Sequence, residues 1–123
     1  MSDLRDRTKA FALRIIKLYT ALPKTTEAQV IGRQALRSGT SIGAHYREAL
    51  RARSNAEYIS KLEVGLQELE ETGYWLELLA DAEIVTPQRL DSLHQETKEL
   101  LAILVSCVKT AKENKKTEGG NMK

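Results

Sequence analysis

The sequence predicts an all-α protein that folds as an antiparallel up-down-up-down four-helix bundle. Apolar residues recur at helical spacing in four separate segments, and a helix-capping residue precedes each segment. Only two prolines occur in 123 residues, and strong helix formers such as Ala, Leu, Glu and Lys are frequent. Four amphipathic helices joined by short linkers bury their apolar faces against one another, which favours this order of helices.

The first predicted helix covers residues 3–21. Its apolar residues recur on one face: Leu4, Phe11, Ile15, Leu18 and Leu22. Asp3 is the expected N-cap. Pro23 ends the helix, because the residue before a proline avoids helical backbone geometry.

The second predicted helix begins at a capping box in which Thr26 is the cap and Gln29 reaches back to it. Its C-terminal end is ambiguous. Gly39 and Gly43 weaken the helical pattern, so residues 37–43 form either a loop or the middle of a long helix. We favour one helix to about Ala52, bent near Gly39, because helical periodicity resumes after Gly43 and small residues allow close helix packing.

The third and fourth predicted helices have clear starts. Ser54 and Glu57 form a capping box at the head of the third, and Thr86 followed by Pro87 opens the fourth. Beyond residue 113 the sequence is polar and contains two glycines, which is typical of a frayed end. We therefore expect a bundle domain over residues 1–113 and a disordered polar tail over residues 114–123.

Composition limits the classes of function. The lone Cys107 has no internal disulfide partner, which favours a reducing compartment. Charged residues occupy the N-terminus where a signal peptide has an apolar run, and no apolar stretch is long enough to span a bilayer. We expect a cytoplasmic protein without a membrane partner. A net charge of +2 implies nucleic-acid binding only where the cations cluster.

The sequence shows no set of residues that organises catalysis. His45 and Glu48 are three residues apart but lack the further ligands that a metal site needs. Cys107 lies on the apolar stripe of the fourth helix, where a small buried side chain is expected. Neither a nucleophile elbow nor a phosphate-binding glycine loop is present. We expect no enzyme activity, no cofactor and no metal.

The second helix carries a row of arginines. If this helix is continuous, four arginines fall within an arc of about 80°: Arg33, Arg37, Arg47 and Arg51. One interpretation is a solvated face whose charges pair with glutamates of a neighbouring helix. The other is a surface for an anionic partner, with RNA or DNA favoured because arginine binds phosphate with two hydrogen bonds.

The third helix has apolar residues opposite its main stripe, where a monomeric bundle leaves them exposed. These residues are Val64, Trp75, Leu78 and Leu79, with Tyr74 at the edge. An exposed apolar patch that contains tryptophan is typical of an interface, unless a chain end or loop covers it. Leu13 and Ile16, which lie off the main stripe of the first helix, are candidate complements on a neighbouring subunit.

Residues 37–49 and 54–62 each contain a motif, and together these motifs resemble the family of proteins encoded in intervening sequences of 23S ribosomal-RNA genes. The first runs from Arg37 to Ala49 and matches the family pattern R-S-x-x-S-I-x-A-N-x-x-E-A at Arg37, Ser38, Ser41 and Glu48. The second, S-x-x-E-[FY]-I-x-x-L, is present as residues 54–62, and residues 70–76 also fit. One position departs from the pattern, because His45 stands where the family has asparagine.

The resemblance implies a bundle that assembles as a ring, commonly a homopentamer. It also implies kinship with the accessory variability determinants of diversity-generating retroelements, which bind nucleic acid and a reverse transcriptase through a basic surface. From both sources we expect a non-enzymatic, ring-forming bundle that binds RNA or another nucleic acid. The alternative is a protein-interaction scaffold whose arginine row makes salt bridges between subunits.

Overall fold

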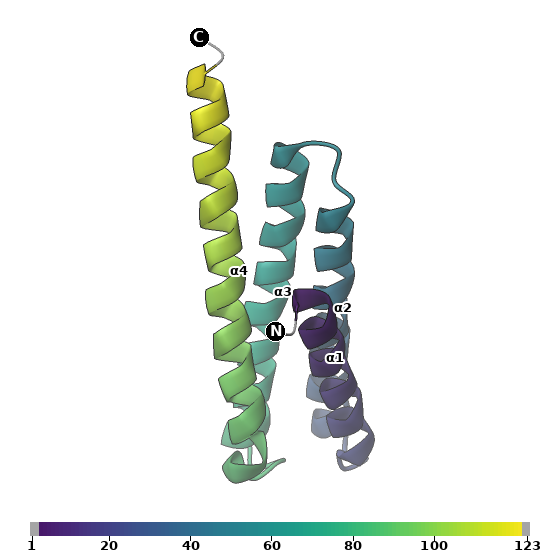
Figure 1. Ribbon diagram of the computed structural model, residues 1–123. Coiled ribbons are helices and arrows are strands. Elements are labelled where there is room, and N and C mark those ends of the chain that lie inside the picture. Colours follow the sequence, from purple (N-terminus) through teal and green to yellow (C-terminus); the bar gives the residue numbers. More distant parts are fainter. Residues whose placement is uncertain (1–2, 122–123) are drawn as a thin grey trace.

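The computed structural model describes the backbone of residues 3–121 and the side-chain burial of residues 3–114. It contains four helices: α1 (Leu4–Ala21), α2 (Thr26–Leu50), α3 (Asn55–Asp81) and α4 (Pro87–Asn121). Successive helices run in opposite directions and lie side by side (Figure 1). No strand occurs in this part of the chain. The predicted all-α, up-down-up-down four-helix bundle is confirmed.

The helix starts follow the predicted caps with one exception. The carboxylate of Asp3 accepts a hydrogen bond from the backbone N–H of Asp6 at 3.0 Å, and the Ser54 hydroxyl accepts one from Glu57 at 3.1 Å. The predicted cap at Thr26 is wrong, because Thr25 takes the extended cap geometry. Gln29 is therefore not part of a capping box, and its side chain donates to the carbonyl of Pro23 instead.

α2 is one continuous helix through Gly39 and Gly43, so the loop alternative for residues 37–43 is excluded. The glycines allow α1 to pack closely against α2. A Cβ atom added at Gly39 would lie 2.9 Å from Cγ1 of Ile15, and one at Gly43 would lie 3.0 Å from Oγ1 of Thr8. α2 ends at Leu50, two residues before the expected position, which is within the usual uncertainty of a helix end.

The core contains residues of all four helices, among them most of the apolar face predicted for α1. Its fully buried large side chains are Phe11, Ile15, Ile42, Leu62, Leu69, Leu76, Leu79, Leu90, Leu100 and Leu104. α1 and α4 pack less closely than the helix pairs that are consecutive in the chain (Figure 1). Long side chains link these two helices, since Arg7 donates to both carboxylate oxygens of Glu96 at 2.6 and 3.1 Å.

The helices at the two ends of the chain differ in length. α4 continues as helix to Asn121 and extends beyond the other helices, whereas α1 is the shortest helix (Figure 1). The tail that we expect from residue 114 therefore begins as a continuation of α4, because its lysines, glutamate and threonine are compatible with helix. Residues 122–123 of the expected tail lie outside the described residues.

Candidate nucleic-acid interface

The four arginines of α2 are all exposed. Because α2 is continuous, three of them lie on the helix itself and Arg51 lies at its C-cap. Arg33 and Arg51 are eighteen residues apart, which corresponds to about 27 Å along the helix. The continuous helix therefore keeps the predicted row exposed along α2, and the structure gives its members different surroundings.

Arg37 is engaged by α3. Its Nη1 donates to Glu68 at 3.2 Å and its Nη2 donates to Glu71 at 2.7 Å. The hydrogen bond that Arg37 donates to Glu71, helped by the charges of both carboxylates, raises the pKa of the Arg37 guanidinium. The interpretation that the arginines pair with glutamates of a neighbouring helix is correct at this position. Arg37 joins α2 to α3 within one chain.

The other three arginines have no such partner. Arg33, Arg47 and Arg51 form no ion pair with any side chain described between residues 3 and 114. Arg47 lies in the last turn of α2, where a cation complements the helix dipole by about 0.3–1 kcal/mol. This interaction does not bury the guanidinium group, so its hydrogen-bond donors are available to a ligand.

Lys9 of α1 is a cation that the sequence analysis missed. It lines a groove of about 320 Å³ between α1 and α2, together with Arg47. It is exposed and forms no ion pair with a side chain in the described part of the chain. The helical wheel of α1 places Lys9 beside Ala12, but only the packing of α1 on α2 brings it to Arg47.

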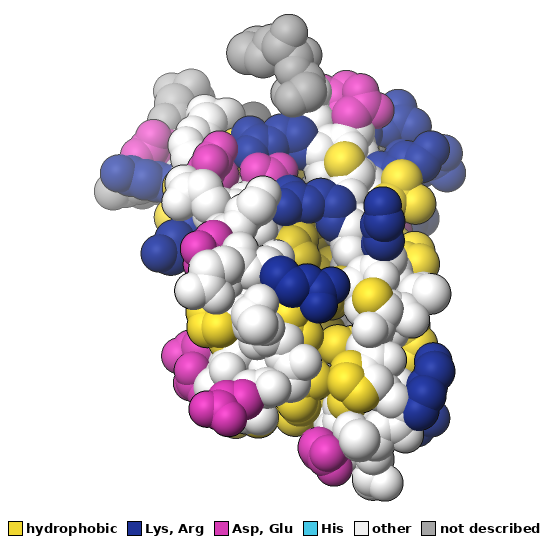
Figure 2. Space-filling model, turned by 90° about the horizontal axis from the view of Figure 1, so that it is seen from below, with side chains coloured by type: hydrophobic (Ala, Val, Ile, Leu, Met, Phe, Trp, Pro, Cys, Tyr) yellow, Lys and Arg dark blue, Asp and Glu magenta, His cyan; other side chains and the backbone are white. Residues whose placement is uncertain are grey.

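Charge on the surface is mixed. The face seen in Figure 2 carries Lys and Arg side chains interspersed with Asp and Glu, and hydrophobic side chains are visible between them. This agrees with the small net charge of +2. Any attraction for a polyanion on this face must therefore come from a local group of cations, since the face as a whole is not basic.

The family-like motif of α2 packs this helix against α3. The buried Ser38 hydroxyl lies 2.7 Å from the hydroxyl of Thr72, and Ser41 donates to the carbonyl of Ser38 at 2.9 Å. Glu48 accepts a hydrogen bond from Lys61 at 2.8 Å, and this bond and the positive charge lower the pKa of Glu48. These residues therefore have structural roles at the junction of α2 and α3.

His45, which stands at the family's asparagine position, lies over a glycine of α3. A Cβ atom added at Gly65 would be 3.6 Å from Cβ of His45. Nδ1 of His45 is buried without a hydrogen-bond partner, and Oε1 of Glu48 is 3.6 Å away, which is beyond hydrogen-bond distance. Histidine fills the space at this position without making a side-chain hydrogen bond through Nδ1.

The predicted oligomer interface is partly exposed. Leu13, Ile16 and Tyr74 are 56%, 44% and 52% exposed. Val64, Trp75 and Leu78 are half-buried. Trp75 contacts Tyr74, with ring centroids 5.0 Å apart, and its indole Nε1 is buried without a hydrogen-bond partner.

Leu79 does not belong to this interface. It is fully buried in the core cluster that also contains Leu76 and Val85. Leu79 is three residues from Leu76, so the two side chains lie on the same face of α3. Its assignment to the opposite face was wrong.

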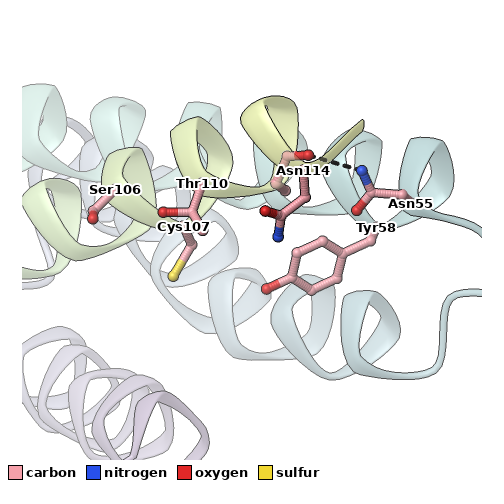
Figure 3. A pocket seen from close by; sticks show the side chains of 7 residues that line it. Asn55, Tyr58, Ser106, Cys107, Thr110 and Asn114 are labelled. Atoms are coloured by element: carbon pink, nitrogen blue, oxygen red, sulfur yellow. Dashed lines mark hydrogen bonds between the residues drawn. The ribbon is translucent and has the colours of Figure 1, made fainter. Parts of the chain in front are cut away.

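A second pocket lies between the start of α3 and residues 106–114 of α4 (Figure 3). Its volume is about 270 Å³, and Tyr58 and Cys107 line it from the two helices. Burial raises the pKa of the Cys107 thiol and of the Tyr58 phenol, so neither side chain is activated as a nucleophile or base. Asn55 donates to the carbonyl of Ala111 at 2.8 Å across this pocket.

The described residues offer neither a metal-binding cluster nor a membrane-spanning helix. They contain no group of three or more His, Cys, Asp or Glu side chains that could hold a metal ion. None of their helices is both long enough and apolar enough to cross a membrane. The fold and the site together define a class of protein: a small helical bundle with a local group of exposed cations.

The chain belongs to the family of 23S rRNA-intervening sequence proteins, whose family model matches residues 2–106. It is also similar to the crystal structure of a protein with unknown function from the S23 ribosomal protein family of Bacteroides thetaiotaomicron. The two are 42% identical, with a TM-score of 0.82 over 87% of this chain and 99% of the other. Neither description indicates an enzyme. No curated protein matches this chain.

Proposed function

We propose that this bundle is a non-enzymatic nucleic-acid-binding protein that contacts phosphates through the exposed arginines of α2. One observation carries the proposal: Arg37 is paired within the chain, whereas Arg33, Arg47 and Arg51 are exposed without an ion pair among the described side chains. Arg37 joins α2 to α3 through its carboxylate partners, and no such link is formed by the other three arginines among the described side chains. The unpaired arginines are the ones that a phosphate backbone contacts.

The chemistry of these arginines favours backbone contacts over base contacts. A guanidinium group donates two parallel hydrogen bonds to a phosphate. Arg47 and Arg51 are one helical turn apart, and Arg33 is about 21 Å further along α2 from Arg47. Binding therefore falls steeply as salt concentration rises and shows little sequence preference.

We propose further that the protein forms a ring, and that the ring strengthens this weak site. A closed ring requires a heterologous interface, in which one surface of a subunit meets a different surface of the next. The exposed side chains of Leu13 and Ile16 on α1 and of Tyr74 on α3 supply two such surfaces. Repeating the arginines around a ring increases affinity through avidity, without any new contact.

The second candidate function is a protein-interaction scaffold in which the arginine row joins subunits through salt bridges. The pairing of Arg37 with Glu68 and Glu71 favours it in principle, because it shows that this row can bind carboxylates. That pairing lies within one chain, however, so it does not itself join subunits. The scaffold requires Arg33, Arg47 or Arg51 to meet carboxylates of a neighbouring subunit.

The two candidates separate in one experiment. The double variant Arg47→Gln/Arg51→Gln removes two unpaired cations, and Arg37→Gln is the matched control that removes the paired one. The mass of each assembly is measured by light scattering, and a mixed RNA pool is then titrated at low and moderate salt. The proposal predicts lost RNA binding with an unchanged assembly for the double variant, and retained binding for Arg37→Gln.

Two outcomes contradict the proposal. Loss of the assembly in the double variant supports the scaffold. Absence of RNA binding by the parent protein at low salt removes nucleic-acid binding altogether. A parent protein that scatters as a clean monomer would remove the ring while leaving the arginine site to be tested alone.

A further inference from the structure

The groove between α1 and α2 is lined by cations from both of its walls. Lys9 and Ala12 line it from α1, and Thr40, Ala44 and Arg47 line it from α2. None of its lining residues is acidic, although Asp and Glu are almost as numerous in the chain as Lys and Arg. Two like charges beside one groove repel each other, and folding alone gives no reason to place them there.

The floor of the groove is built from small residues. Gly43 carries no side chain, and a Cβ atom there would lie 3.0 Å from Oγ1 of Thr8, so the two helices approach closely. Ala12 and Ala44 add only methyl groups to the lining. A chain of ligand atoms can therefore lie along this floor, at the surface between the two helices, with Lys9 on one side and Arg47 on the other.

The lining also limits the kind of nucleic acid. No aromatic side chain lines the groove, whereas proteins that bind single strands commonly stack bases on aromatic rings. The Thr40 hydroxyl donates to the carbonyl of Leu36 at 2.7 Å, so its free lone pairs act only as acceptors. An acceptor of this kind suits a sugar hydroxyl, and the 2′-hydroxyl distinguishes RNA from DNA.

We infer that the groove between α1 and α2 holds the sugar–phosphate backbone of duplex RNA. Lys9 and Arg47 contact a phosphate from opposite sides, and Thr40 accepts a hydrogen bond from a ribose hydroxyl. The inference rests on the proposed function and names the form of nucleic acid that the function requires. It also adds α1 to a site that the sequence places on the second helix alone.

The test compares two variants of α1 that make the same chemical change. Lys9→Gln removes the cation that lines the groove, and Lys17→Gln removes an exposed lysine that does not line it. A 16-base-pair RNA duplex, the matching DNA duplex and one single RNA strand are titrated at several salt concentrations. Lys9→Gln should weaken duplex RNA binding about tenfold and reduce the salt slope by about one, and Lys17→Gln should change affinity less than about twofold.

A third variant tests the hydroxyl. Thr40→Val keeps the shape of the side chain and removes its acceptor, so it should bring the affinities for the RNA and DNA duplexes within about twofold of each other. Far-ultraviolet circular dichroism verifies that each variant is folded.

The outcomes separate this inference from the proposed function. If the parent binds nucleic acid but Lys9→Gln behaves like Lys17→Gln, the groove is not the site and the proposed function stands. Tighter binding of the single strand, or of anionic phospholipid vesicles, also overturns the inference. If the parent binds none of the nucleic acids at low salt, the proposed function fails and the inference fails with it.

Discussion

The two sides of α2 are built differently. Towards α3, charged side chains meet their partners, as Arg37 meets Glu71 and Glu48 meets Lys61. Towards α1, glycines and alanines bring the helices together, and the cations Lys9 and Arg47 line the groove without an ion pair among the described side chains.

The difference teaches that a position on a helical wheel does not determine the role of a charge. Arg37 and Arg47 belong to the same outer arc of α2, but one neighbouring helix offers carboxylates and the other offers a lysine. The first arginine stabilises the fold. The second has its hydrogen-bond donors free, and we assign it to a ligand.

The largest expected effect on stability tests the close packing of α1 on α2. Gly39→Ala places a methyl group against Ile15, which costs about 1–3 kcal/mol and outweighs a gain of about 1 kcal/mol in helix propensity. Gly73→Ala is the matched control, because an added Cβ there meets only Thr97, at an ordinary 3.6 Å. Urea unfolding should separate the two variants by about 2 kcal/mol, and equal stabilities would refute the tight packing.

A smaller effect compares the two arginines directly. Arg37→Gln removes two largely exposed ion pairs with α3 and should lower the free energy of unfolding by about 1 kcal/mol. Arg47→Gln should lower it by less, about 0.3–0.5 kcal/mol, because it loses only an exposed interaction with the helix dipole and no described carboxylate pairs with it. Urea unfolding of both variants checks the contrast. A larger loss for Arg47→Gln would reverse the roles assigned to them.

The smallest effect is the pH dependence of the contact between Glu48 and Lys61. The hydrogen bond and charge of Lys61 hold the pKa of Glu48 below its ordinary value. Its stabilising contribution is therefore present above the ordinary pKa and disappears as the pH falls through the lowered one. Lys61→Gln should flatten the loss of stability on acidification from pH 6 to pH 3, measured by urea unfolding. An unchanged acid profile would show that the pair contributes nothing.

The sequence predicted the elements of the fold well, because capping and periodicity are local signals. Asp3, Ser54 and Pro87 start their helices as expected. The prediction of Thr26 as the cap was wrong by one residue, since adjacent threonines carry the same local signal. The burial of Leu79 was not predicted, because Leu79 was grouped with the adjacent Leu78 and with Trp75 on the opposite face. Leu79 follows Leu76 by three residues and therefore lies on the core face.

The candidate site was predictable only in part. The spacing of the four arginines predicted a shared arc on the condition that α2 is continuous, and α2 is continuous. The spacing does not show which helix packs beside each arginine. The neighbouring helix determines the partners, as α3 does when it brings Glu68 and Glu71 to Arg37. Lys9 was missed for the same reason, because the groove is formed by two helices and no single helical wheel shows it.

The most direct test of the division between the paired and unpaired arginines is the salt dependence of RNA binding. The logarithm of the binding constant is measured against the logarithm of salt concentration for the parent, Arg37→Gln and Arg47→Gln. Each phosphate contact contributes a slope of roughly −0.9. We expect Arg47→Gln to lower the magnitude of the slope by about one unit and Arg37→Gln to leave it unchanged. Equal slopes for the two variants, or a larger change for Arg37→Gln, would contradict the account.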